Sequence, residues 1–165
     1  SRRSSDLRKM FVKLPSLLGL SIDDNLKPKV RYFLEDLGVK KTDFLKMIVK
    51  LPSLLGLSID DNLKPTVRYF LEDLEVKKTD FTKMIVTFPS LLGYSIDDNL
   101  KPKVRYFLED LEVKKTDFRK MIVSKPQLLG YSIDDNLKPK VGICISDLGI
   151  ECPPLRSEVR SSSLW

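Results

Sequence analysis

The sequence predicts an all-α protein, a curved superhelical solenoid built from 37-residue repeats. Three observations lead to this fold class. The octapeptide SIDDNLKP occurs four times, with its prolines at positions 28, 65, 102 and 139. A second proline series, at positions 15, 52, 89 and 126, has the same spacing. Residues 52–88 and 89–125 differ at only five positions, so the repeats arose by recent duplication or by consensus design.

Residues 1–165 are predicted to form one repeat domain, in which each repeat packs on its neighbours. The four repeats span about residues 5–41, 42–78, 79–115 and 116–152. The last repeat diverges, since Gly142-Ile143-Cys144-Ile145 stands where the previous repeat has Arg105-Tyr106-Phe107-Leu108. Residues 153–165 are expected to be a frayed C-terminal cap. Hydrophobic residues make up 42% of the chain, which is enough for a continuous core, and no stretch approaches the ~20 apolar residues of a membrane span.

The second repeat illustrates the first predicted helix. Thr42 can cap the helix, and Asp43 suits its positive N-terminal end. Four apolar residues fall on one helical face, at positions i, i+3, i+4 and i+7: Phe44, Met47, Ile48 and Leu51. Pro52 ends this helix because the residue before a proline avoids the α conformation.

A short turn and a second helix are predicted next. Residues 53–56 are expected to form a single 3₁₀ turn that closes at Gly56. Ser58 is the expected N-cap of the second helix, with Asp61 completing a capping box. One apolar stripe follows: Ile59, Leu63, Val67, Phe70, Leu71 and Leu74.

The position of Pro65 depends on where the second helix begins. With Ser58 as the N-cap, the proline lies inside the helix and should kink it, which would curve every repeat in the same direction. With Asn62 as the N-cap, the proline lies in the first turn and costs little. We favour the longer, kinked helix because Ile59 belongs to the apolar stripe.

These motifs together resemble the repeat of the mTERF family, the mitochondrial and chloroplast transcription termination factors. In the first repeat the resemblance is carried by Pro15-Ser16-Leu17-Leu18, by residues 21–30 and by residues 33–38, and it continues through residues 43–48. It covers about residues 5–150. Two departures stand out: Glu75 and Glu112 replace the glycine expected after the second helix, and four repeats are fewer than in typical arrays of the family.

The resemblance implies a superhelix that binds nucleic acid in a mitochondrion or chloroplast, usually double-stranded DNA and in some plant members RNA. It further implies a role in transcription termination or regulation, and we expect no cofactor. The N-terminal SRRSS is rich in Arg and Ser, as organelle transit peptides are.

Stacked repeats would align equivalent basic side chains in columns along the solenoid. The second helix contributes three columns: Lys27, Lys64, Lys101 and Lys138; Arg31, Arg68 and Arg105; and Lys29, Lys103 and Lys140, with Thr66 as the gap. The first helix contributes Lys46, Lys83 and Lys120 as predicted contacts. Basic residues in the middle of a helix, flanked by acids at both ends, could follow a phosphate backbone.

A second interpretation assigns no nucleic acid to these charges. Asp60 and Lys64 are four residues apart, as are Arg68 and Glu72, so they could simply pair on a solvated surface. The same solenoid could then be a protein-interaction scaffold, or a consensus-type repeat protein with only weak non-specific DNA affinity. The tyrosines that precede the core phenylalanines (Tyr32, Tyr69 and Tyr106) could either stack on bases or pack between repeats.

One position of the first helix varies among the repeats: Arg8, Leu45, Thr82, Arg119 and Arg156. This variation is either drift or unit-by-unit recognition of a ligand, and Arg119 is therefore a candidate contact. The chain has no His, and paired acids such as Asp23-Asp24 suit a helix N-terminus, so we expect no catalytic or metal site. Cys144 and Cys152 are expected to be reduced thiols, and the protein is expected to be a monomer that binds no membrane.

Overall fold

A computed structural model describes residues 2–149, except for the side chains of residues 2–4, 6, 7 and 10. All regular elements in this range are helical, which confirms the all-α prediction. The chain forms two compact units, Ser1–Gly93 and Tyr94–Trp165. The predicted C-terminal cap at residues 153–165 lies outside the described residues.

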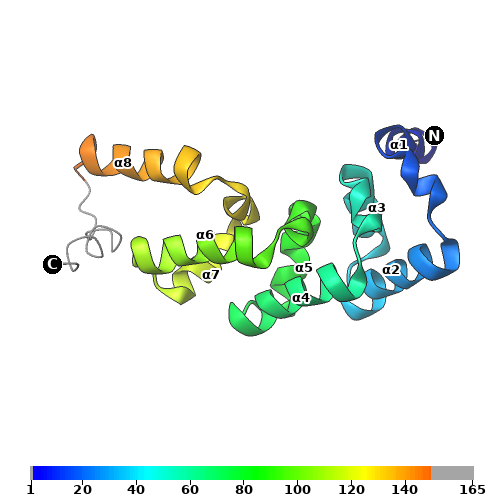
Figure 1. The fold of residues 1–165 in the computed structure, drawn as a ribbon, viewed down its shortest axis with the longest axis horizontal. Coiled ribbons are helices and arrows are strands. Elements are labelled where there is room, and N and C mark those ends of the chain that lie inside the picture. The colour runs from blue at the N-terminus through cyan, green and yellow to red at the C-terminus, as the bar shows by residue number, and fades with distance from the viewer. Residues whose placement is uncertain (1, 150–165) are drawn as a thin grey trace. The chain divides into compact units, whose positions relative to one another are not determined.

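Each repeat consists of a first helix, a 3₁₀ turn and a longer second helix (Figure 1). In the second repeat these are α3 (Lys41–Lys50), η4 (Pro52–Gly56) and a continuous helix made of η5 (Ile59–Leu63), α4 (Lys64–Arg68) and η6 (Tyr69–Asp73). The η5 and η6 segments have π-type turns, while α4 between them is α-helical. This order matches the predicted order of elements.

The other repeats have equivalent elements. The first contains α1 (Arg2–Lys13), η1 (Pro15–Gly19), η2 (Ile22–Leu26), α2 (Lys27–Arg31) and η3 (Tyr32–Asp36). The third contains α5 (Lys78–Thr87), η7 (Pro89–Gly93), η8 (Ile96–Leu100), α6 (Lys101–Arg105) and η9 (Tyr106–Asp110). The fourth contains α7 (Lys115–Ser124), η10 (Pro126–Gly130), η11 (Ile133–Leu137) and α8 (Lys138–Ser146).

The N-cap of the first helix lies two residues earlier than predicted, and it is of a different kind. In α3 the N-cap is Lys40, whose extended backbone makes no side-chain capping bond, so the predicted capping role of Thr42 is wrong. The predicted buried face is confirmed for Phe44, Met47 and Ile48. Backbone geometry, together with the burial of this face, therefore starts the helix without a polar cap.

The second helix starts at the predicted N-cap. The Ser58 Oγ accepts a hydrogen bond from the Asp61 backbone amide at 3.2 Å, and the same bond recurs in all four repeats. The Ser58 amide donates to the Asn62 side chain at 3.0 Å. In a standard capping box the Asp61 carboxylate would accept the hydrogen bond from the Ser58 amide, whereas here the Asn62 side chain accepts it. Ser58 rather than Asn62 is thus the N-cap, and Pro65 lies inside the helix.

The π-type turns explain how the proline fits there. The Leu63 amide donates to the Ser58 carbonyl at 3.1 Å, five residues back. An α-helical turn would place the proline ring against the carbonyl four residues before it. The wider turn next to Pro65 gives that ring room. The kink itself stays a prediction.

The helix end keeps a left-handed residue in every complete repeat. Gly38 has φ +70°, and Glu75 and Glu112 hold φ values of 54° and 51° at the same position. The Val76 amide closes the end by donating to the Phe70 carbonyl at 2.9 Å. The replacement of glycine therefore does not change the C-cap, although a side chain in this conformation is strained.

Aromatic pairs connect neighbouring repeats. Phe70 of the second repeat contacts Phe81 of the third, with ring centroids 5.1 Å apart. Phe33 and Phe44 form the equivalent pair at 5.0 Å, and Phe107 and Phe118 at 5.3 Å. The prediction of an inter-repeat core is confirmed for Phe70 and Leu74, which are buried, whereas Leu71 is only half-buried.

Candidate nucleic-acid interface

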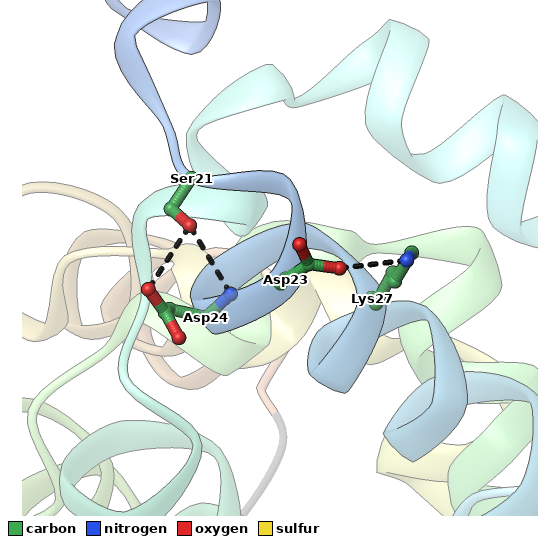
Figure 2. A network of polar contacts seen from close by, with 4 residues as sticks. All are labelled: Ser21, Asp23, Asp24 and Lys27. Atoms are coloured by element: carbon green, nitrogen blue, oxygen red, sulfur yellow. Dashed lines mark hydrogen bonds and ion pairs between the residues drawn. The ribbon is translucent and has the colours of Figure 1, made fainter.

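The first lysine column is exposed but paired within each repeat. Lys27, Lys64, Lys101 and Lys138 bind the first Asp of their SIDDNLKP motif at 2.6, 2.7, 2.7 and 2.7 Å. Figure 2 shows the arrangement in the first repeat, where Asp24 interacts with the capping Ser21 and Asp23 points to Lys27. The bond to Asp134 is the main cause that raises the pKa of Lys138. Exposed pairs of this kind are weak, so a phosphate can replace the aspartate.

The lysine column at Lys29 and Lys103 requires a correction. These side chains are buried, at 5% and 7% exposure, and their ammonium groups donate to the carbonyls of Leu55 and Leu129 in the next repeat. Burial lowers the pKa of both lysines. A buried ammonium that is bound to the backbone cannot reach a phosphate, so Lys29 and Lys103 are removed from the candidate interface.

The other two members of this column differ from each other. Thr66, the gap in the sequence pattern, is 2% exposed, so this position is buried even without a lysine. Lys140 is exposed and lies over the Tyr131 ring at 5.2 Å, much as Lys103 lies over Tyr94 at 5.1 Å. Only Lys140 of this column stays a candidate contact.

The arginine column of the second helix differs from the first lysine column in its ion pairing. Arg31, Arg68 and Arg105 are exposed, and within residues 2–149 none of them forms an ion pair. The expected pair between Arg68 and Glu72 is thus not formed in this part of the chain. In the first repeat Arg31 and Lys27 line one shallow groove of about 330 Å³, with Leu26, Val30, Leu34 and Glu35. The structure therefore brings members of two predicted columns together.

The predicted lysines of the first helices are all exposed. Lys46 and Lys120 lie 3.3 and 3.8 Å from Asp43 and Asp117 of their own helices. Lys83 instead lines a cavity with Lys40 and Lys78 of the double-lysine loops. Both belong to the repeated Lys-Lys pairs of the sequence (Lys40-Lys41, Lys77-Lys78 and Lys114-Lys115), which form a basic double column but were not among the predicted contacts.

The tyrosines beside the arginine column are core residues. Tyr32, Tyr69 and Tyr106 are 7%, 7% and 3% exposed, and each packs edge-on against the following phenylalanine. Burial, assisted by Asp73, raises the pKa of Tyr69 to about 12. Burial of these rings excludes stacking on bases, whereas their packing between repeats stays a prediction.

The variable position of the first helix lies at the edge of the core. Leu45 is 43% exposed, while Thr82 and Arg119 are half-buried. The Thr82 hydroxyl lies 3.0 Å from the Leu37 carbonyl and 2.9 Å from the Lys78 carbonyl. Its role in recognition stays a prediction, and Arg156 lies outside the described residues.

No helix among the described residues has the length and apolar character needed to cross a membrane. The model of the mTERF family matches residues 2–162 of the chain. A search of curated proteins found no match. Members of the matched family are non-enzymatic, organelle-associated helical-repeat proteins that bind nucleic acid.

Proposed function

The chain belongs to the mTERF family, and from this premise we propose that it is a non-enzymatic nucleic-acid-binding repeat protein whose favoured partner is double-stranded DNA. Its proposed role is transcription termination or regulation in a mitochondrion or chloroplast. The proposal assigns no cofactor and no catalytic residue to the chain.

The arginine column is the observation that best supports this proposal. Arg31, Arg68 and Arg105 are exposed, recur every 37 residues and make no ion pair within residues 2–149. A guanidinium group binds phosphate through two parallel hydrogen bonds, which suits a regularly spaced backbone. Further proposed contacts are Lys27, Lys64, Lys101, Lys138, Lys140, Lys46, Lys83, Lys120 and Arg119.

A binding panel tests the proposal directly. Duplex DNA, single-stranded DNA and RNA of equal length are compared at one low salt concentration. We expect saturable binding that is strongest for the duplex, and Arg68→Ala should weaken it for all duplex sequences. Lys41→Ala is the matched control, since it removes an exposed positive charge outside the proposed contacts. No binding of any nucleic acid at low salt would refute the proposal.

The variable position supports a finer proposal, that Arg119 contributes to sequence preference. Arg can read guanine through paired hydrogen bonds. Arg119→Ala should therefore change the ranking of several duplexes, whereas Arg68→Ala should lower all their affinities alike. Unchanged relative affinities in Arg119→Ala would mean that the variable column reads no sequence.

One observation favours the alternative, a protein-interaction scaffold. All four lysines of the first column are neutralised by an aspartate of their own repeat. A surface with paired charges can bind a protein as well as a phosphate. A stoichiometric protein partner that is retained after nuclease treatment would support the scaffold.

A further inference from the structure

A cationic cleft lies where the first and second repeats meet helix α5. Its volume is about 530 Å³, within the range of small-molecule sites in proteins. The end of the first repeat supplies Leu37 and Gly38, and the loop before α3 supplies Lys40. Most of the remaining lining comes from α5, from Lys78 to Thr87. All of these residues belong to the compact unit Ser1–Gly93.

The lining combines apolar and cationic groups. Leu37 and Val86 contribute apolar side chains, while Lys40, Lys78 and Lys83 are exposed lysines that border the cleft. The acid in the lining, Asp43, is engaged by Lys46 at 3.3 Å. Three ammonium groups against one paired carboxylate leave the cleft positively charged, which favours an anion.

Two small residues leave this space open. Gly38 has no side chain, and Thr82 has a short one. One repeat later the same positions hold Glu75 and Arg119, which are long and of opposite charge. The two small residues that leave this space open are thus not part of every repeat.

The wall of the cleft is held in place by hydrogen bonds. The Thr82 hydroxyl lies within hydrogen-bond distance of the Leu37 and Lys78 carbonyls, at 3.0 and 2.9 Å. It therefore links the end of the first repeat to the start of α5. A cleft that is already formed needs little rearrangement to accept a ligand.

We propose that this cleft binds a nucleoside phosphate, with its phosphate between Lys40, Lys78 and Lys83 and its ring against Leu37 and Val86. The inference goes beyond the arginine column, because it assigns a site for a single nucleotide and not a track for a backbone. Lys83 belongs to both surfaces. The nucleotide can be free in solution or part of a nucleic-acid strand.

Adenosine 5′-monophosphate is the probe that tests the cleft. Titration of the full chain, followed by amide NMR shifts, should give saturable changes at Gly38, Thr82 and Lys83. Adenosine and inorganic phosphate each supply half of the ligand and should bind about tenfold or more weakly. A single-stranded oligonucleotide is then added as a competitor. If it displaces the monophosphate from the cleft, the site accepts a nucleotide within a strand. If it does not, the site accepts the free nucleotide. No saturable change at the cleft with the monophosphate would overturn the proposal.

Two variants and a control sharpen the test. Thr82→Arg copies Arg119 of the next repeat, so it should fold, and it fills the cleft while adding a positive charge. It should lower the affinity for the monophosphate about tenfold or more. If charge alone attracted the ligand, the added arginine would raise the affinity instead. Lys83→Ala should weaken it about tenfold, the value of one charged hydrogen bond. Lys13→Ala removes an exposed charge at the end of α1, outside the lining and outside the proposed contacts, and should have little effect. Equal binding by Thr82→Arg and the unchanged chain would exclude this site.

Failure of the cleft is distinguishable from failure of the proposed function. Arg68 is not part of the cleft lining, so duplex binding through the arginine column should persist in Thr82→Arg. If the duplex binds while the monophosphate does not, only the cleft is refuted. If the monophosphate binds while no nucleic acid does, only the proposed function is refuted.

Discussion

Two glutamates hold a backbone conformation that suits glycine. Glu75 and Glu112 have φ values of 54° and 51°, where the first repeat has Gly38 at φ +70°. The steric cost of this conformation for a residue with a Cβ is about 1 kcal/mol. The helix end keeps its hydrogen bonds, so the strain is compensated by the rest of the fold.

Glu112→Gly should therefore stabilise the protein. Removing the side chain relieves the strain, although it also frees the unfolded chain, so we expect a gain of about 0.5–1 kcal/mol in the free energy of unfolding. Denaturant melts measure the change. Gly38→Ala is the converse control and should destabilise the protein by a similar amount. A loss of stability in Glu112→Gly would show that the glutamate side chain contributes more than its strain costs.

The buried tyrosines make stability depend on alkaline pH. The pKa of Tyr69 is about 12 in the folded chain, against an ordinary value of 10.0, because burial disfavours the phenolate. Below pH 10 both states keep the proton, and this contribution to stability is complete. Between pH 10 and 12 only the unfolded state loses the proton, so stability falls by up to about 2 kcal/mol.

Tyr69→Phe tests this assignment. The lowered pKa of Lys103 acts in the opposite direction, since the folded state releases that proton first. Phenylalanine has no hydroxyl to titrate, so we expect Tyr69→Phe to lose less stability than the unchanged chain between pH 10 and 12. Denaturant melts at several pH values measure the slope, and tyrosinate absorbance follows the titration. Identical slopes would contradict the burial of this hydroxyl.

At the scale of elements, a buried lysine links each of two second helices to the following 3₁₀ turn. Lys29 in α2 reaches the Leu55 carbonyl in η4, and Lys103 in α6 reaches the Leu129 carbonyl in η10. The Lys103 ammonium also donates to the Asn99 side chain at 2.9 Å. These lysines stabilise the stacking of repeats.

Lys103→Ala should consequently affect folding more than binding. It leaves the Leu129 carbonyl without its partner and should cost about 1–3 kcal/mol in a denaturant melt. Arg105→Ala, two residues away and exposed, should cost less than about 0.5 kcal/mol and should weaken nucleic-acid binding instead. The reverse pattern would return Lys103 to the interface.

The aromatic pair between the second and third repeats is a second contact between elements. Phe70 in η6 is 0% exposed and lies 5.1 Å from the Phe81 ring in α5. Phe70→Ala should cost about 3–5 kcal/mol, because it removes a fully buried ring and leaves a cavity. Leu71→Ala is the control and should cost less, since Leu71 is half-buried. A loss within about 0.5 kcal/mol for Phe70→Ala would contradict this packing.

At the scale of the whole molecule, the number of available cations matters more than the net charge of +6. Each phosphate contact contributes about −0.9 to the slope of log affinity against log salt. The three arginines alone give a slope of about −3, and adding the four lysines of the first column gives about −6.

We expect a slope of about −6 or steeper, because exposed Asp–Lys pairs are too weak to hold the lysines against a phosphate and the other proposed lysines add to it. Affinity for one duplex across a range of salt concentrations measures it. A slope near −3 would mean that the aspartates keep their lysines in the complex. Asp60→Asn should then make the slope steeper by about 1, since it releases Lys64.

The sequence by itself determined the period, the order of elements, the Ser58 cap and the burial of Phe70. Each of these follows from local rules: proline and capping chemistry act within a few residues, and helical spacing places apolar side chains on one face. Family membership was visible for the same reason, because it rests on those spacings. The predicted arginine column lies at exposed positions, and its contact with nucleic acid stays a prediction.

The tertiary structure alone decided which cations are available. Lys27 and Lys29 are two residues apart, and the sequence pattern treats them alike, yet one faces water and the other a carbonyl of the next repeat. The cleft beside Gly38 and Thr82 likewise depends on residues that lie more than 37 positions apart in the chain. Contacts between repeats set the environment of each side chain, and a single repeat read alone does not contain them.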